Sequence, residues 1–122
     1  MSNTDIVNRF LAALHHNEVG EALNLMTDDI FYHNIPMEPL RGKAAVKDFL
    51  ERESDLEVLD LVTLHSAENG NIVMNERVDT FRLDGRVLDL PVMGIFELEN
   101  GKIKAWRDYF DLNTFVSFRG QG

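Results

Sequence analysis

The chain has 122 residues, enough for one hydrophobic core but not for two, so we expect a single domain over residues 1–122. Asp and Glu (21) outnumber Lys and Arg (12), the formal charge is -9, and no basic run occurs, which argues against nucleic acid and anionic membranes as partners. The sequence contains no cysteine, which excludes disulfides, thiolate zinc sites and thiol nucleophiles and suits a cytoplasmic location.

The first half of the chain has the apolar spacing of helices. Apolar residues on one stripe from Ile6 to Leu14, with Thr4 available as N-cap, predict a first helix. A second, short helix is expected after Asn17, with inward-facing apolar residues at Ala22, Leu23, Leu25 and Met26 and an end at the cluster 27–29. The pattern then predicts a strand over 30–34, a Pro- and Gly-containing loop over 35–42 and a third helix over 44–50.

The second half is divided by the turn dipeptides Asn69-Gly70, Asp84-Gly85 and Asn100-Gly101. Each is typical of a two-residue hairpin turn, so four antiparallel strands are predicted over 58–67, 72–83, 87–98 and 103–110. Pro91 inside the third of these strands indicates a bulge or an edge. We expect little C-terminal chain to close a cavity. Helices followed by a meander indicate an α+β fold with helices on one face of a curved sheet.

Five polar residues recur at strand spacing, namely Tyr32 and Asn34, Arg77 and Asp79, and Asp108. Successive side chains of a strand face opposite ways, so each pair shares one face. Buried charges destabilise a protein unless they are paired and hydrogen-bonded, and such a group in an apolar interior is costly as mere structure. We therefore interpret these five residues as a candidate catalytic site.

The alternation does not by itself decide which face of the second long strand is inside. Arg77 and Asp79 are in phase with apolar Val73 and Phe81, but the opposite face carries a second apolar set, Ile72, Met74 and Val78. An exposed ion pair across the sheet therefore stays open as an alternative. Asp108 is a stronger candidate, because it lies between Trp106 and Phe110 on its face.

The five residue types suit general acid and base chemistry. A carboxylate that accepts a proton and a carboxylic acid that donates one need different ionisation states at the same pH. Arg77 between two aspartates could keep one ionised and leave the other protonated. Tyr32 and Asn34 offer a hydroxyl and an amide that can hold a water molecule. This chemistry needs no metal.

Four segments in this order resemble the limonene-1,2-epoxide hydrolase family over nearly the whole chain: Tyr32-His33-Asn34-Ile35-Pro36, Glu76-Arg77-Val78-Asp79, Gly101-Lys102-Ile103 and Trp106-Arg107-Asp108-Tyr109-Phe110-Asp111-Leu112. The resemblance implies the cone-shaped α+β fold of the nuclear-transport-factor-like and ketosteroid-isomerase-like superfamily. In that fold, a strongly curved, mostly antiparallel sheet carries three to four helices on its concave side. The resemblance also implies a homodimer without a cofactor.

By the same resemblance, Asp108 is the general base that takes a proton from a water held also by Tyr32 and Asn34. Asp79 is the acid that protonates the epoxide oxygen, and Arg77 hydrogen-bonds both aspartates. Water then opens a small apolar epoxide to a vicinal diol in one step, without a covalent intermediate. The implied pocket wall consists of Phe81, Leu90, Val92 and Phe110.

Two other functions remain open at this point. An isomerase or cyclase of the same superfamily would use an aspartate to remove a proton next to a carbonyl, and it would need one essential carboxylate and not two. A noncatalytic, dimeric module that binds a small ligand would keep the cavity without the chemistry.

Overall fold

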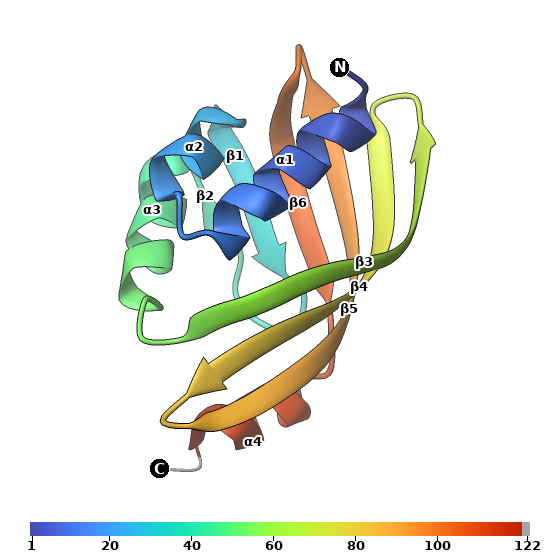
Figure 1. Ribbon diagram of the computed structural model, residues 1–122. Helices are drawn as coiled ribbons and strands as arrows, with labels where there is room; N and C mark the ends of the chain where they lie inside the picture. Colours follow the sequence, from blue (N-terminus) through green and yellow to red (C-terminus); the bar gives the residue numbers. More distant parts are fainter. Residues whose placement is uncertain (121–122) are drawn as a thin grey trace.

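The computed structural model of this protein describes residues 1–120, which fold into one six-stranded sheet with helices against it (Figure 1). The elements in chain order are α1 (Asn3–His15), α2 (Val19–Asn24), β1 (Met26–Asn34), β2 (Leu40–Arg41), α3 (Lys43–Arg52), β3 (Glu57–Asn69), β4 (Ile72–Leu83), β5 (Arg86–Glu99), β6 (Lys102–Tyr109) and α4 (Leu112–Gly120).

The sheet order is β2-β1-β6-β5-β4-β3, and every neighbouring pair is antiparallel except β1 and β6, which run parallel. The predicted α+β class and mostly antiparallel sheet are confirmed. The place of β1 beside β6 could not be read from local spacing, because it joins segments about seventy residues apart along the chain. This pairing matters, because it brings the two ends of the predicted site together.

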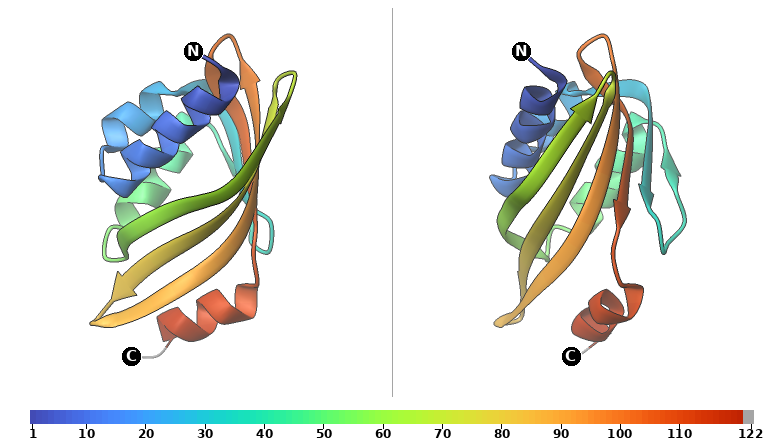
Figure 2. Two further views of the ribbon diagram at one scale, coloured as in Figure 1. Left: turned by 45° about the vertical axis from the view of Figure 1, so that its right-hand side comes forward. Right: turned by 90° about the vertical axis from the view of Figure 1, so that its right-hand side faces the viewer.

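The sheet bends toward the helices but does not curl as strongly as the expected cone (Figure 2). The long β4–β5 ladder runs from Ile72–Glu97 to Leu83–Arg86 without a register shift. Bulges, which bend strands locally, lie in the neighbouring pairings, at Val58/Asp60 and Thr63/His65 of β3 and at Glu97/Leu98 of β5. The pairing of β4 with β5 is therefore regular, and the irregularities lie in the pairings on either side of it.

Helices α1, α2 and α3 cover one face of the sheet, as predicted (Figure 2). Phe10 of α1 makes edge-to-face contacts with Phe96 of β5 and Trp106 of β6, and all three rings are buried. The N-cap of α1 is Ser2 and not Thr4: the Ser2 hydroxyl accepts from the Asp5 amide at 3.0 Å, and the Asp5 carboxylate accepts from the Ser2 amide at 3.1 Å. This reciprocal capping box holds two otherwise unpaired backbone donors.

Two boundaries in the first half differ from the prediction. Helix α2 ends at Asn24, and Met26 begins β1, so the strand is longer than the predicted 30–34. The register shift between Met26 and Phe31 breaks the alternation, which is why the polar residues 27–29 appeared to end a helix. Strand β2 lies inside the predicted loop. It was not predicted, because a strand of two residues is too short to show an alternating pattern.

The three hairpins occur where the turn dipeptides predicted them, with one correction. Asp84-Gly85 and Asn100-Gly101 have positive φ at both residues. In the first hairpin Asn69 pairs with Ile72, so the turn residues are Gly70 and Asn71, and Gly70 has φ +60° as the first of the two. A glycine in the first position is typical of a type II′ turn, in which only that residue needs positive φ.

Pro91 lies in the part of β5 that extends beyond the pairing with β6, which begins at Met93–Tyr109. Its missing amide therefore costs no ladder bond there, and the edge alternative is right.

Helix α4 was not predicted, although Asp111 carries its signal, accepting from the Thr114 hydroxyl and amide. Figure 2 shows α4 beyond the end of the sheet, below the β4–β5 hairpin. Among the residues described, no helix combines the length and apolar character needed to cross a membrane.

Candidate active site

Strand β4 points three consecutive same-face polar side chains into the protein. Asn75, Arg77 and Asp79 are 2%, 1% and 6% exposed, whereas Met74 and Glu76 face outward. The open question of the inner face is thereby answered, and the exposed ion pair is excluded. Asp108 of β6, 5% exposed, faces the same interior.

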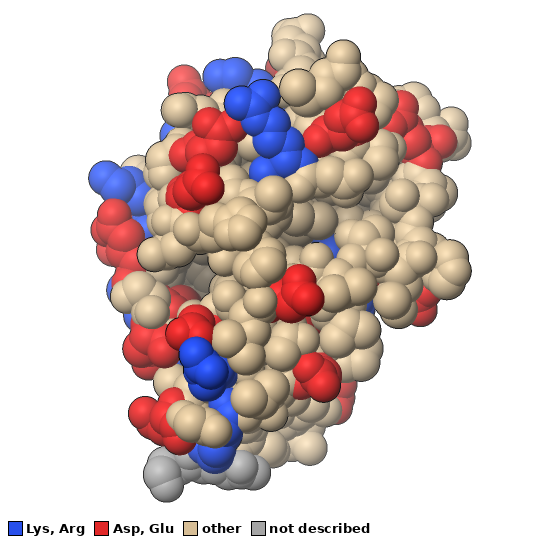
Figure 3. Space-filling view, viewed as in Figure 1, with Lys and Arg blue, Asp and Glu red and all other residues tan. Residues whose placement is uncertain are grey.

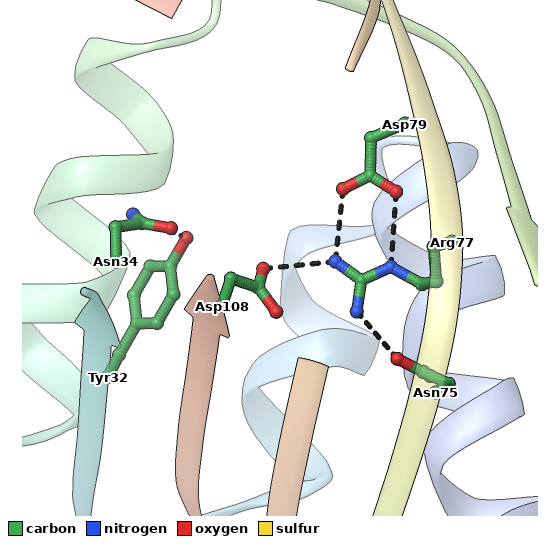
Figure 4. A network of polar contacts seen from close by, with 6 residues as sticks. All are labelled: Tyr32, Asn34, Asn75, Arg77, Asp79 and Asp108. Carbon is green, nitrogen blue, oxygen red and sulfur yellow. Dashed lines mark hydrogen bonds and ion pairs between the residues drawn. The ribbon is translucent and has the colours of Figure 1, made fainter. Parts of the chain in front are cut away.

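The Arg77 guanidinium joins both aspartates (Figure 4). Nε and Nη2 donate to the two oxygens of Asp79 at 3.1 and 3.0 Å, and Nη2 also donates to Oδ2 of Asp108 at 3.0 Å. Burial works against the charged form of Arg77, but the charges of Asp108 and Asp79 outweigh it and raise the pKa of the guanidinium. Arg77 therefore stays a cation between two carboxyl groups.

Asp108 differs from Asp79 in having one free oxygen. Its Oδ1 is buried and makes no hydrogen bond to any residue in the described part of the chain, while both oxygens of Asp79 accept from Arg77. Burial raises the pKa of the Asp108 carboxyl above its ordinary value, although the charge and hydrogen bond of Arg77 oppose the rise. Oδ1 of Asp108 is thus an acceptor with increased proton affinity.

Tyr32 and Asn34 reach this site because β1 runs beside β6, with Tyr32 level with Trp106 and Asn34 level with Asp108. The Tyr32 ring stacks on Trp106 with 3.8 Å between centroids, and Asn34 Nδ2 donates to the Tyr32 hydroxyl oxygen at 2.9 Å. Burial and then the charge of Asp108 raise the pKa of Tyr32, so its hydroxyl stays neutral. The Tyr32 hydroxyl can therefore donate a hydrogen bond to a molecule bound in the site.

Gly94 of β5 leaves the space that the guanidinium occupies. A Cβ built on Gly94 would collide with Arg77 Nη1 and would lie 2.8 Å from Asn75 Oδ1 and 2.9 Å from Asp108 Oδ1. Real carbon atoms do not approach so closely without displacement of the neighbours. Only glycine allows the β5 backbone to pass this network undisturbed.

The five predicted site residues all line one cavity of about 590 Å³. The predicted wall residues line it as well, namely Phe81, Leu90, Val92 and Phe110. In Figure 3 the surface is hollowed left of centre, where the ends of α1 and α3 and the start of β3 converge; His15 and Glu53 line the cavity there. Charged side chains of both signs are mixed on this face, without a continuous basic patch. Within residues 1–120, no three His, Asp or Glu side chains are placed to hold a metal ion.

The sequence model of the family named limonene-1,2-epoxide hydrolase catalytic domain matches residues 1–119. The chain belongs to the limonene-1,2-epoxide hydrolase family. It is 28% identical over 114 residues to epoxide hydrolase EphG of Mycobacterium tuberculosis, covering 93% of this chain and 75% of that protein.

Solved structures share the fold of this family member. A limonene-1,2-epoxide hydrolase-like epoxide hydrolase of M. tuberculosis superposes with a TM-score of 0.85 at 26% identity, covering 97% of this chain and 90% of that one. A putative polyketide cyclase of Pseudomonas putida superposes with a TM-score of 0.81 at 23% identity, covering 96% and 97% of the two chains. The second similarity concerns the fold alone.

The sequence analysis of this family member missed several residues of the site. Asn75 is in phase with Arg77 and Asp79, so the alternation that put those two on one face also puts Asn75 there. Gly94 carried a weaker signal, a glycine inside a strand. Phe115 also lines the cavity, and it was out of reach because α4 itself was not predicted.

We predict that Gly94→Ala destabilises the protein by about 1–3 kcal/mol, the usual cost of overpacking a core, because the new methyl group must displace the hydrogen-bonded guanidinium. Urea unfolding measures the change. Gly20→Ala is the matched control, since Gly20 lies in α2 with no heavy atom within 4 Å of a built Cβ, so alanine there should be neutral or stabilising. Equal stability of Gly94→Ala and the native protein would contradict the conclusion that residue 94 must be glycine for the β5 backbone to lie this close to Arg77.

Proposed function

We propose that this protein is an epoxide hydrolase that adds water to a small apolar epoxide and releases a vicinal diol, by general acid and base catalysis in one step. The observation that carries the proposal is the buried Asp79–Arg77–Asp108 network in a cavity with mostly apolar walls. Membership of the family and the similarity to a protein named as an epoxide hydrolase support it. A cytoplasmic location is part of the proposal.

Asp108 is proposed as the general base. Asp108 lines the cavity, and its Oδ1 has no hydrogen-bond partner among the described residues, so the carboxyl group keeps an acceptor position for the proton of water. The Tyr32 hydroxyl and the Asn34 amide, on the neighbouring strand, would orient the same water. The raised proton affinity of a buried carboxylate favours proton removal from water, because general bases work best when their pKa approaches the working pH.

Asp79 is proposed as the general acid. Each carboxyl oxygen offers two acceptor positions, so Asp79 can carry a proton and still accept from Arg77 at both oxygens. Its proton would pass to the epoxide oxygen as the carbon–oxygen bond breaks. The ring oxygen thereby leaves as a hydroxyl group and not as an alkoxide.

The charge balance of the network supports one shared proton. Two carboxylates and one guanidinium carry a net charge of -1 among buried side chains, and uptake of a single proton makes the group neutral. In the proposed step, water forms a bond to the epoxide carbon and loses a proton to Asp108 while Asp79 gives its proton to the departing oxygen. Return of one proton from Asp108 to Asp79 through solvent restores the starting state.

The cavity wall supports a neutral, apolar substrate. Apolar side chains line the cavity together with the network, among them Phe81, Leu90, Val92, Leu11, Phe49 and Leu50. An apolar ring fits such walls, whereas a charged group would lose its hydration without a free partner.

Hydrolysis of a panel of neutral epoxides in ¹⁸O-labelled water tests this mechanism, under single-turnover conditions with enzyme in excess. We predict one labelled oxygen in the diol formed on the first turnover, because water attacks carbon directly. Mass spectrometry of the diol measures the label.

The free Oδ1 of Asp108 could instead attack carbon itself, in which case the first diol would carry an unlabelled oxygen from the protein. That result would refute the one-step mechanism. The Asp108→Asn variant is the control, and its rate should fall by at least about 100-fold, a typical contribution of one proton-transfer group. Absence of turnover on every epoxide would refute the proposed activity.

We also propose that the protein forms a homodimer through the outer face of its sheet. An apolar patch there consists of Val62, Met74, Met93 and Tyr109, each partly exposed on neighbouring strands. Polar side chains on this face are paired within the sheet, His65 with Glu76 at 2.9 Å and Arg107 with Glu97 at 2.6 Å. A patch of this kind is suited to burial against its own copy.

Met93→Lys places a charge on the most central residue of this patch, 48% exposed, and should convert the dimer to a monomer. Sedimentation velocity measures the mass. Val116→Lys is the control, because Val116 is similarly exposed but lies on α4, away from the patch. A native protein that sediments as a monomer, or a Met93→Lys variant that stays dimeric, would contradict this interface.

A further inference from the structure

Asn75 is buried beside the network, and neither the family resemblance nor the proposed chemistry gives it a role. We infer that Asn75 is a positioning residue that keeps Oδ1 of Asp108 free by holding Nη1 of Arg77 away from it. The inference rests on the proposed function, in which Oδ1 accepts the proton of water. Asn75 acts through Arg77 and touches neither the water nor the substrate.

Each nitrogen of the Arg77 guanidinium has a separate acceptor. Nε and Nη2 bind the aspartates, and Nη1 donates to Asn75 Oδ1 at 2.9 Å (Figure 4). Asn75 is 2% exposed, so water cannot readily replace this oxygen. Without Asn75, Nη1 would be a buried cationic donor with no partner, which is costly.

An alternative acceptor for Nη1 is Oδ1 of Asp108. Both atoms border the position that a Cβ of residue 94 would take: such a Cβ would touch Nη1 and would lie 2.9 Å from Oδ1. No side chain of β5 separates them, because Gly94 has none. A rotation of the guanidinium toward Asp108 would let Arg77 donate to both of its oxygens, as it now donates to both oxygens of Asp79.

Such a double contact would weaken the base in two ways. It would occupy the oxygen that accepts the proton, and it would stabilise the carboxylate and lower its proton affinity. The groups that face Asp108 are Arg77 and Asp79 from β4, Tyr32 from β1 and the indole of Trp106 on its own strand, while β5 contributes uncharged Gly94. Among them, Arg77 is the cation whose orientation can change this balance.

Two substitutions at position 75 should therefore move the protein in opposite directions. Asn75→Leu removes the oxygen that accepts from Arg77 Nη1 and keeps a similar side-chain volume. We expect kcat to fall about 10- to 100-fold with KM little changed, which is the usual effect of losing a residue that orients a catalytic group without touching the substrate. The acidic limb of the kcat/KM profile should move to lower pH. Asn75→Asp keeps an oxygen for Nη1 and adds a negative charge, so the same limb should move to higher pH.

The ¹³C chemical shift of the Asp108 carboxyl, followed by NMR against pH, gives the same comparison without any substrate. Its titration should move down in Asn75→Leu and up in Asn75→Asp. Thr80→Val is the control, because it removes a side-chain hydrogen bond to Asp89 on the outer face of the same strand, and it should leave the titration unchanged. If leucine prevents folding, Asn75→Ala removes the same acceptor and should shift the titration downward.

An unchanged Asp108 titration in Asn75→Leu or Asn75→Ala would overturn the inference, as would shifts in the same direction for the leucine and aspartate variants. The failure of the proposed function looks different. A native protein that hydrolyses no epoxide refutes the function, whereas a native protein that is active and an Asn75→Leu variant with native kcat refute only the role of Asn75.

Discussion

The structure depends on a single buried cation, Arg77, which is shared by two carboxyl groups. Arg77 is 1% exposed, and removal of one partner from such a buried pair typically costs about 3–5 kcal/mol. The surrounding chain is arranged to satisfy it: Asp79 and Asn75 on its own strand, Asp108 across β5, and Gly94 where the backbone must pass. The same interaction that makes this charge tolerable gives the two aspartates different surroundings.

That difference is what links the fold to chemistry. Asp79 is held at both oxygens, whereas Asp108 is held at one, and its other oxygen is buried without a hydrogen-bond partner among the described residues. The parallel pairing of β1 with β6 then adds Tyr32 and Asn34 on the side of Asp108. A shared fold alone would not indicate hydrolysis, since a putative polyketide cyclase has the same architecture. The paired carboxyl groups and their common arginine are the features that favour water addition.

The sequence predicted the elements with strong local signals and missed those that depend on distant contacts. Turn dipeptides located the meander, and alternation put Arg77 and Asp79 on one face and Asp108 between two aromatic residues, but the structure was needed to show that the face of Arg77 and Asp79 is the inner one. The pairing of β1 with β6, the two-residue β2 and the moderate curl of the sheet are tertiary properties that no local pattern encodes. Asn75 was within reach of the same alternation, but a neutral amide draws less attention than a buried charge.

The central claim is that Asp79 and Asp108 act as one unit through Arg77. Single-turnover rates of diol formation by Asp79→Asn, Asp108→Asn and the double variant test it most directly. The account predicts that each single variant loses nearly all activity and that the double variant is no slower than the worse single one, because either change already disables the unit. Losses that multiply in the double variant, or a single variant that keeps most of the native rate, would contradict it.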